Sequence, residues 1–397
     1  SVTKVYAIPG SAAMSDCAEL VGIDWQQSDH LIRFLKDNHV DLVVVGPEAP
    51  LVAGLADVLN KAGVPVFGSS KAAAQLEGSK VFAKDLMRKY NIPTAAYGVF
   101  HKEDEAKEFI AQTGAPIVVK ADGLAAGKGV VVAMTVEEAN AAVEDMLSGN
   151  RFGEAGSTVV IEEFMEGEEV SLLAFVDGKT VVPMIASQDH KRIFDGDKGP
   201  NTGGMGTYAP APVLTDAVRD EAMKTILEPM VAAMQKEGMP YVGCLYAGLM
   251  ITPQGPKVVE FNARFGDPET QVVLPLLDSD LGQVMMACAT GTLTADMVKW
   301  KDSSAACVIL ASKGYPETSS KGDVIHGDIK QHDTTIVFHS GTKLVGEEYV
   351  TNGGRVIGVV GLGKDLRTAL DRAYGRIEHI NFEGMQYRTD IGAKAFK

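Results

Sequence analysis

The sequence predicts an α/β protein with three parts: a doubly wound parallel α/β domain, a larger middle part, and a small C-terminal α+β domain. Near the N-terminus, short β-branched runs alternate with amphipathic segments, an order typical of a parallel sheet with helices on its faces. The 397 residues are enough for two or three domains. Beyond about Lys301, short strands and Gly-rich turns replace this alternation, with a last helix near Leu366–Ile377.

The first part is expected to hold buried strands and amphipathic helices. The β-branched runs Lys4–Ile8, Asp41–Val45 and Val64–Phe67 predict strands. Helical spacing predicts helices over Leu31–Lys36 and Leu51–Leu59. A doubly wound domain normally begins with a strand, a glycine turn and a helix, and no such unit precedes these elements. We therefore expect this first domain to be incomplete at its start.

The middle part alternates strands with longer helices. Helices are expected over Ser79–Tyr90, with Ser79 as the N-cap, over Glu137–Leu147 and over Ala217–Lys236. The expected strands are Pro116–Lys120, Val130–Val132, Thr158–Ile161, Val170–Phe175, Thr180–Pro183, Tyr246–Thr252 and Lys257–Phe261. The stretch from Gln188 to Tyr208 is polar and rich in glycine, which predicts a long functional loop.

The composition excludes several classes of protein. The 37 basic residues are outnumbered by 52 acidic ones, and the net charge of −15 disfavours a nucleic-acid partner. No apolar run approaches the ~18–20 residues of a membrane span, and the first residues lack the pattern of a signal peptide. The four cysteines lie far apart in the sequence, which predicts free thiols and a cytoplasmic location.

A glycine loop, Asp122–Gly129, joins two of the predicted strands. It is not a P-loop, because Gly123 and Gly127 enclose only three residues and Gly129 stands where the magnesium-binding hydroxyl should be. One interpretation is a flap that folds its N–H groups and Lys128 over phosphates. The alternative is a plain hairpin loop with a solvated lysine.

Glu260 and Asn262 are separated by one apolar residue on a predicted strand. Residues i and i+2 of a strand face the same side, so a carboxylate and an amide oxygen point to one place. Hard oxygen ligands of this kind suit Mg²⁺. Arg264 follows at once and can hold an oxyanion beside the metal. Taken alone, the pair also fits a solvated polar edge; the continuous run Glu260–Thr270 favours the metal site.

Two further segments carry candidate ligand-binding groups. The acidic run 161–169 is interrupted by Phe164 and Met165, which indicates either a turn beside an apolar pocket or a solvated face. In the first case its carboxylates could receive sugar hydroxyls or an adenine amine. In the 188–208 stretch, adjacent glycines leave backbone N–H groups for an anion, and His190 has no second metal ligand at helical spacing.

Together, these segments resemble one family of ATP-grasp ligases, the glycinamide ribonucleotide synthetases. The matching stretches, in the family's order, are Gly46–Leu51, Ser79–Lys80, Lys120–Val130, Glu162–Phe164, Ser187–Arg192, Pro200–Gly206, Glu260–Glu269 and Asn352–Val356. Their combination is highly specific, and they extend over nearly the whole chain. The resemblance implies an ATP-grasp domain over residues 78–295, with a mobile lid around 115–180, between an N-terminal substrate-binding domain (1–77) and a C-terminal domain (301–397).

The resemblance also implies an activity in purine biosynthesis. ATP, glycine and 5-phosphoribosylamine would give glycinamide ribonucleotide, ADP and phosphate through glycyl phosphate, with Mg²⁺, which Mn²⁺ can replace. The residues it assigns to ATP are Lys80, Lys120, Gly123, Gly127, Gly129, Glu162, Glu163, Phe164 and Glu169. Those it assigns to the other substrates are Gly46, Pro47, Glu48, Asp189, Lys191, Arg192, Asn201, Thr202, Gly203, Gly204 and Asp267. Glu260 and Asn262 would bind the metal, and Arg264 and Lys128 are the catalytic candidates.

Two alternatives remain open. One is another ATP-grasp enzyme of the purine pathway with a different acceptor, such as an aminoimidazole carboxylase, which would use bicarbonate. The other is a catalytically silent ATP sensor. It is favoured by the absence of the family's opening G-x-G-G-R-E-H motif, whereas the intact Glu260, Asn262, Lys80 and Lys120 argue against it. If the protein lacks that motif, phosphoribosylamine binding should weaken more than ATP binding. A monomer is favoured.

Overall fold

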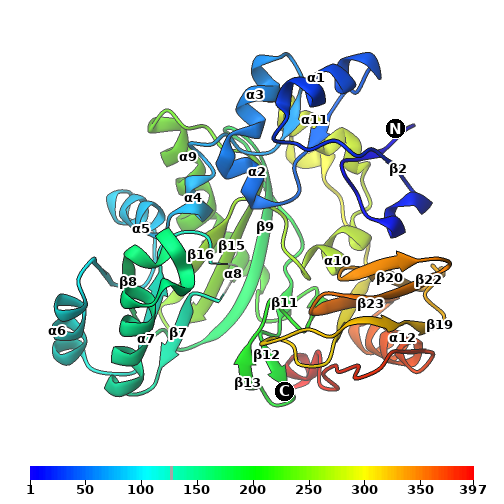
Figure 1. Cartoon of the computed structure of the whole chain (residues 1–397). Coiled ribbons are helices and arrows are strands. Elements are labelled where there is room, and N and C mark those ends of the chain that lie inside the picture. Colours follow the sequence, from blue (N-terminus) through cyan, green and yellow to red (C-terminus); the bar gives the residue numbers. More distant parts are fainter. Residues whose placement is uncertain (126–127) are drawn as a thin grey trace.

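The computed structural model describes residues 1–125 and 128–397, and it confirms a mixed α/β fold (Figure 1). The central part of the chain contains two four-stranded sheets, and the C-terminal part contributes most of a five-stranded sheet. No helix in the described ranges has both the length and the apolar character needed to cross a membrane. Gly127, one of the predicted ATP-binding residues, lies outside the described residues.

The N-terminal part, at the top of Figure 1, has the parallel strand pairs expected from its β-branched runs. Its strands are β1 (Tyr6–Ala7), β2 (Glu19–Leu20), β3 (Val43–Val44) and β4 (Val66–Phe67), and its helices are α1 (Ser28–Asp37), α2 (Glu48–Ala53) and α3 (Leu55–Lys61). The helix predicted over Leu51–Leu59 is two helices, because Gly54 adopts a left-handed conformation with φ of 95°. Leu31, Leu51 and Leu59 anchor this part to the core.

The first central sheet forms a separate layer with two helices. Its strand order is β5-β8-β6-β7, with β5 (Tyr97–Phe100), β6 (Ile117–Ala121), β7 (Val130–Ala133) and β8 (Val159–Glu163). Helices α6 (Glu103–Thr113) and α7 (Val136–Ser148) pack on it through Ile110 and Val143, which are fully buried. Antiparallel pairing of β6 with β7 confirms that the glycine loop joins two strands.

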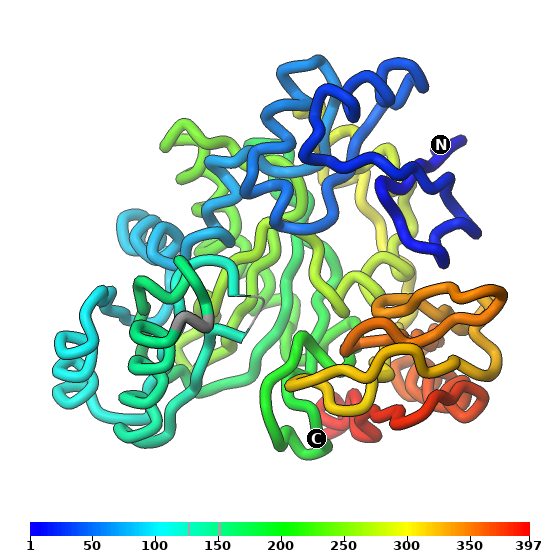
Figure 2. Tube along the Cα trace, viewed as in Figure 1, coloured from blue at the N-terminus to red at the C-terminus, as the bar shows by residue number. Residues whose placement is uncertain are grey.

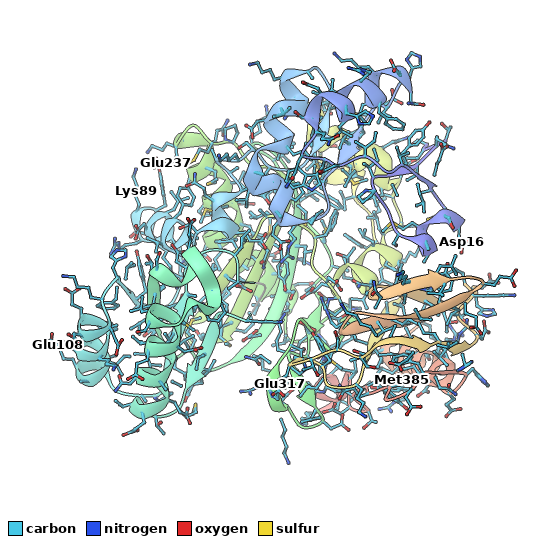
Figure 3. All side chains as sticks on the ribbon, in the orientation of Figure 1. Asp16, Lys89, Glu108, Glu237, Glu317 and Met385 are labelled. Atoms are coloured by element: carbon cyan, nitrogen blue, oxygen red, sulfur yellow. The ribbon has the colours of Figure 1, made fainter. Side chains whose placement is uncertain are left out.

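The second central sheet contains the strand that carries Glu260 and Asn262. Its order is β10-β9-β15-β16, with β9 (Glu168–Asp177), β10 (Val181–Pro183), β15 (Val242–Thr252) and β16 (Gly255–Asn262). Helices α4 (Gln75–Gly78) and α5 (Lys80–Lys89) precede these sheets in the chain. Lys89 on α5 pairs with Glu237 at 2.5 Å, and both are labelled in Figure 3.

The helix predicted over Ala217–Lys236 is continuous but irregular. It consists of α8 (Asp216–Ala222), one π-turn (Met223–Leu227) and α9 (Glu228–Lys236). Pro229 has no N–H to donate to the carbonyl of Thr225, so regular α-helical bonding is interrupted in this region.

The 188–208 stretch is not the structureless loop that its composition predicts. It contains β11 (Gln188–Asp189), the hairpin of β12 (Arg192–Phe194) and β13 (Lys198–Asn201), and β14 (Gly206–Ala209). Strand β14 pairs with β17 (Ser304–Ala311), which lies about a hundred residues further along the chain. Because the two strands are so far apart in the sequence, their pairing produces no local residue pattern, and it could not be predicted from the sequence.

The C-terminal part completes this five-stranded sheet, in the order β11-β14-β17-β23-β20. Strands β20 (Thr335–His339) and β23 (Arg355–Gly363) carry helix α12 (Leu366–Ile377), whose bounds match the prediction. The remaining elements are α10 (Thr270–Val273), α11 (Leu281–Thr290), β18 (Lys321–Val324), β19 (His326–Gly327), β21 (Thr342–Val345), β22 (Glu348–Asn352) and β24 (Ile380–Asn381). Figure 2 shows the C-terminal end of the trace beside the green hairpin β12–β13.

Candidate functional site

The start of helix α5 joins the glycine loop. The Ser79 hydroxyl caps the helix by accepting from the Phe82 N–H at 3.1 Å, as predicted. The next residue, Lys80, donates its backbone N–H to Asp122 Oδ1 at 2.6 Å and its Nζ to the Gly123 carbonyl at 3.0 Å. Burial lowers the pKa of the Lys80 ammonium, and the nearby Glu260 carboxylate opposes this shift. Lys80 and Gly123, predicted separately, are therefore in contact.

A buried carboxylate is shared by two lysines where β8 ends. Glu162 Oε2 lies 3.0 Å from Lys120 Nζ and 3.3 Å from Lys84 Nζ. Lys84 also donates to Thr94 Oγ1 at 2.7 Å, and burial lowers its pKa to about 8. Sequence analysis missed Lys84, although it follows Lys80 at i+4 and so lies on the same face of α5.

Glu162 has a second oxygen without a partner. Within the part of the chain that the structure describes, Oε1 is buried and accepts no hydrogen bond. A buried acceptor left unpaired costs free energy, which a donor on a ligand would recover. Just beyond it, residues 163–166 and the β15–β16 turn line a small pocket of about 200 Å³, and Phe164 is among the lining residues.

The β16 strand displays the two predicted metal ligands. Phe261 is buried in the core, so Glu260 and Asn262 on either side of it lie on the opposite face. Glu260 is exposed, whereas Asn262 is almost covered. No group of three or more His, Cys, Asp and Glu residues in the described ranges could hold a metal. The candidate donors are thus one carboxylate and one amide, and the Lys120 ammonium lies close by, donating to the Val259 carbonyl at 3.2 Å.

Arg264 is held by carboxylates of the N-terminal part. Its Nε donates to Glu48 Oε2 at 3.0 Å, and its Nη2 lies 3.0 Å from Glu77 Oε1. Burial raises the pKa of Glu77 to about 7, an effect that Arg264 opposes. Glu77 also accepts the Ala263 N–H at 2.8 Å. Sequence analysis assigned Glu48 to a substrate loop and missed Glu77, which has no motif around it.

The loop that precedes α2 is short. Val45, Gly46 and Pro47 connect β3 to the first residue of α2, which is Glu48. The predicted Gly46–Glu48 group therefore lies beside Arg264 through its last member. Among the described residues, Gly46 and Pro47 form no hydrogen bond with the other candidates.

A polar cluster surrounds Lys191 at the start of the 188–208 stretch. Lys191 Nζ lies 2.6 Å from Asp189 Oδ2 and 3.9 Å from Glu269 Oε1. The same Glu269 oxygen accepts from the Tyr246 hydroxyl at 2.6 Å and from Ser171 Oγ at 3.4 Å. Burial raises the pKa of Glu269. Ser171 lies on β9 and Tyr246 on β15. Neither was predicted as a site residue, because each stands in an ordinary strand sequence without a motif.

Residues 202–204 are packed against the C-terminal part. Arg355, within the matching Asn352–Val356 stretch, donates to the carbonyls of Gly203 and Asp267, both at 3.0 Å. Gly204 has a φ of 123°, and a Cβ there would lie 2.6 Å from Pro268 Cδ. Only glycine fits, which explains this part of the motif. Thr202 donates its N–H to the Lys191 carbonyl at 2.7 Å.

The remaining predicted residues are less closely connected. Arg192 and Asn201 face each other across the β12–β13 hairpin, and Arg192 donates to the Gly199 carbonyl at 2.7 Å. Lys128 is exposed. Glu163 accepts from the Ala96 N–H at 3.1 Å. The pKa of Glu169 is raised by desolvation, and the Glu260 and Asp189 carboxylates add to this effect.

His190 has a structural position. Its Nδ1 lies 2.9 Å from the Gly206 carbonyl, and its Nε2 accepts the Gly392 N–H at 3.3 Å. Burial lowers its pKa to about 4, so the ring is neutral near pH 7. Both nitrogens are engaged, which leaves neither for a metal.

The fold defines the class of protein. The chain superimposes on a biotin carboxylase–βγ-ATP complex from Campylobacter jejuni with a TM-score of 0.75 and 15% identity, covering 97% of this chain and 87% of the other. The Hydrogenobacter thermophilus 2-oxoglutarate carboxylase biotin carboxylase domain gives a TM-score of 0.74 at 15% identity, with 97% and 86% covered. At this identity the likeness establishes the fold alone, which is the ATP-grasp fold.

The chain belongs to the phosphoribosylglycinamide synthetase family. The N domain of that family matches residues 1–77, its ATP-grasp (A) domain residues 78–270 and its C domain residues 305–394. A phosphoribosylamine–glycine ligase from Halalkalibacterium halodurans is 52% identical over 394 residues, which are 99% of this chain and 92% of the relative. One from Neisseria meningitidis is 51% identical over 396 residues, with 99% and 94% covered. The crystal structure of the Thermotoga maritima ligase gives a TM-score of 0.85 at 33% identity, with 98% and 94% covered.

Proposed function

We propose that this chain catalyses the ATP-dependent ligation of glycine to 5-phosphoribosylamine, giving glycinamide ribonucleotide, ADP and phosphate, a step of de novo purine biosynthesis. Its relatives of about 50% identity bear the name of this ligase. The observation that carries the proposal is the convergence of Lys80, Lys120, Glu162 and Glu260 on one site between the two central sheets. Two cations and two carboxylates placed in this way suit a nucleotide and its metal.

Lys80 and Lys120 would bind the ATP phosphates, under a flap formed by the segment from Gly123 to Gly129. The buried Lys120 ammonium and the partly buried Lys80 ammonium would lower the energy of clustered phosphate charge. The unpartnered Oε1 of Glu162 supports an adenine position in the 162–164 turn, because the adenine amine is a donor that could satisfy it. In this proposal Glu163 and Phe164 flank the base, and Glu169 receives the ribose hydroxyls.

Glu260 and Asn262 would hold Mg²⁺, which Mn²⁺ can replace. One carboxylate and one amide oxygen on the same face of a strand fit a hard cation that completes its shell with water and phosphate. Such an ion, when bound, neutralises the charge of the β- and γ-phosphates. The Glu260 carboxylate acts on the pKa of Lys80, which supports a position beside the phosphates.

Arg264 would hold the γ-phosphate and the glycine carboxylate in line. A guanidinium has five N–H donors. Contacts with Glu48, Glu77 and the Phe265 carbonyl use three of them, leaving two for incoming oxygens. Attack of the glycine carboxylate on the γ-phosphate then gives glycyl phosphate and ADP, and Lys128 in the flap helps to neutralise the transferred group.

The neutral amine of phosphoribosylamine would next displace phosphate from glycyl phosphate. Closure of the flap keeps water away from this reactive intermediate. Contacts to glycine and phosphoribosylamine are assigned to the residues expected from the resemblance: Gly46, Pro47, Glu48, Asp189, Lys191, Arg192, Asn201, Thr202, Gly203, Gly204 and Asp267. The link between Thr202 and Lys191 supports their assignment to one site.

The proposal extends to organisation and setting. We infer a substrate domain over 1–77, an ATP-grasp domain over 78–295 with a mobile lid around 115–180, and a C-terminal domain over 301–397. A monomer is proposed as the working unit. A cytoplasmic location is supported by four free cysteines, of which Cys244, Cys288 and Cys307 are buried.

The test is the release of ADP from Mg-ATP, with each substrate omitted in turn. Phosphoribosylamine is unstable and is generated in the assay. Release that requires both glycine and phosphoribosylamine supports the ligase. Release that requires bicarbonate in place of glycine would assign the chain to the aminoimidazole carboxylase type. ATP binding without release in any mixture would indicate a silent sensor.

A further inference from the structure

We propose that Arg388 and Asp390 are positioning residues that hold the 188–206 segment in the shape required for binding glycine and phosphoribosylamine. This inference rests on the proposed function for the identity of those substrates. We call residues 386–394, which run along this segment near the end of the chain, the C-terminal strap. In Figure 2 the strap lies beside the β12–β13 hairpin.

Arg388 is the centre of the strap. It is the largest fully buried side chain among the described residues, with 1% of its surface exposed. Its Nε and Nη2 each lie 2.8 Å from an oxygen of Asp390, forming a two-pronged pair. Its Nη1 donates to Asp197 Oδ1 at 2.9 Å and to the Arg192 carbonyl at 3.2 Å. A buried guanidinium is tolerated only when its donors are used, and here Nε and Nη2 are used on Asp390 of the strap and Nη1 on the hairpin.

Other strap residues bind the turn between β12 and β13. Asp390 Oδ2 accepts the Gly196 N–H at 2.9 Å, and the Thr389 N–H donates to Asp195 Oδ1 at 2.8 Å. Lys394 lies 3.0 Å from Asp197 Oδ2. Asp197 has a φ of 56°, a left-handed conformation that is uncommon for a residue other than glycine. The strap therefore stabilises a turn that its own backbone preferences do not favour.

The turn is coupled to the polar residues at the base of the segment. Arg192, whose carbonyl binds Arg388, is next in sequence to Lys191, which pairs with Asp189. Thr202 binds the Lys191 carbonyl with both its N–H and its hydroxyl, at 2.7 and 2.8 Å. Releasing the turn would consequently displace Lys191 and Thr202. The candidates for binding the ATP phosphates and adenine, Lys80, Lys120 and Glu162, lie on α5, β6 and β8, outside this segment, so they would stay in place.

The kinetic test uses Asp390→Asn, which keeps the side-chain shape and removes half of the charge pair with Arg388. The expected result is a rise of about tenfold in KM for glycine or phosphoribosylamine, with KM for ATP unchanged, because the misplaced groups touch only those substrates. Asp197→Asn, which acts from the hairpin side, should have the same effect. The matched control is Asp216→Asn, which removes the carboxylate of an exposed Arg–Asp pair on α8.

A second measurement does not depend on activity. Hydrogen exchange of the ligand-free protein should accelerate at the Thr202 and Met205 amides in Asp390→Asn, and stay as in the wild type on β9. Equal rises in KM for all three substrates, or unchanged exchange at those two amides, would overturn the proposal. If the wild-type chain has no ligase activity, the proposed function fails, and exchange still decides whether the strap orders the segment.

Discussion

At the scale of single residues, the shared carboxylate of Glu162 has the clearest consequence. Two buried lysines, Lys84 and Lys120, compete for its Oε2, while its Oε1 has no partner among the described residues. In a low-dielectric interior this arrangement leaves positive charge in excess next to the place proposed for the nucleotide phosphates. Burial, with a further contribution from the Lys120 charge, lowers the pKa of Lys84 to about 8. Lys84 is thus a supporting residue that no motif identified.

Replacing Lys84 by Met tests this role. The substitution removes a buried partner of Glu162 and leaves Lys120 in place, so the free energy of unfolding should fall by about 2 kcal/mol. Urea denaturation measures the loss. Lys89→Met on the same helix is the control, because Lys89 forms a solvent-exposed pair with Glu237 and its replacement should lower the free energy of unfolding far less. Equal losses in the two variants would contradict a special role for Lys84.

Glu260→Gln tests the metal assignment. The glutamine keeps the size of the exposed side chain and removes its charge, so the fold should survive and kcat should fall by about a hundredfold or more. Steady-state turnover at saturating Mg-ATP and a melting curve provide the two readings. Glu347→Gln, in the exposed turn after β21, should leave both unchanged. A turnover close to that of the wild type would remove Glu260 from the proposed metal site.

At the scale of elements, the start of α5 combines stability with substrate binding. Its cap, Ser79, satisfies a helix N–H, and the next residue carries one of the proposed phosphate-binding groups. Helix α7 has a matching cap in Thr135, which accepts the Glu138 N–H at 3.2 Å and is not one of the candidate site residues. The two helix starts therefore have the same kind of hydroxyl cap, but only the start of α5 is proposed to bind substrate.

The two caps make a paired prediction. Ser79→Ala and Thr135→Ala should each lower the free energy of unfolding by about 1 kcal/mol, because each leaves a helix N–H without its acceptor. Only Ser79→Ala should also raise KM for ATP, since Lys80 and Asp122 share its network. Chemical denaturation and initial-rate kinetics on both variants separate the effects. A raised KM for ATP in Thr135→Ala would show that the loss of a cap weakens ATP binding by destabilising the whole protein, and not through Lys80.

At the scale of the whole molecule, the C-terminal part and the 188–208 segment are one structural unit. They share a five-stranded sheet, and His190 joins the segment to the strap through Gly392. Two arginines of the C-terminal part reinforce this joint: Arg355 at Gly203 and Arg388 at Asp197. The stability of the joint should depend on the protonation of His190.

His190 predicts a pH dependence with a definite sign. Its pKa in the folded chain is about 4, below the ordinary value of 6.5. Between these values the unfolded chain binds the proton and the folded chain does not, so the free energy of unfolding falls as pH drops from 6.5 to 4. The full effect is about 3 kcal/mol. It is measured as the difference between wild type and His190→Gln in urea unfolding across this range.

The comparison of wild type with His190→Gln is needed because other groups titrate in an overlapping pH range. Glu77 has a pKa raised to about 7, so the folded chain keeps its proton between pH 4.5 and 7 and its contribution to stability declines as pH rises there. This slope is opposite in sign to that of His190 and cancels in the comparison. A pH-independent difference between wild type and His190→Gln would contradict a neutral buried ring.

Much of the fold and the core of the candidate site could be read from local patterns. The β-branched runs predicted β6 and β7 around the glycine loop, and the sequence pattern predicted a last helix near the bounds observed for α12. The candidates Lys80 and Gly123, and the alternation of Glu260, Phe261 and Asn262, followed from motifs a few residues long, whereas the contact between Lys80 and Gly123 is known only from the structure. The sequence by itself determined these features, because helix, strand and turn preferences depend on near neighbours.

Only the tertiary structure decided which distant groups meet. Strand β14 pairs with β17, Glu77 holds Arg264, and Arg388 binds the turn at Asp197, all across long stretches of chain. Their partners lie from about a hundred to almost two hundred residues away, so no local spacing records them. Burial makes the difference: a charged side chain removed from water must find its partner wherever the packed chain places one, and that place exists only once the core has formed.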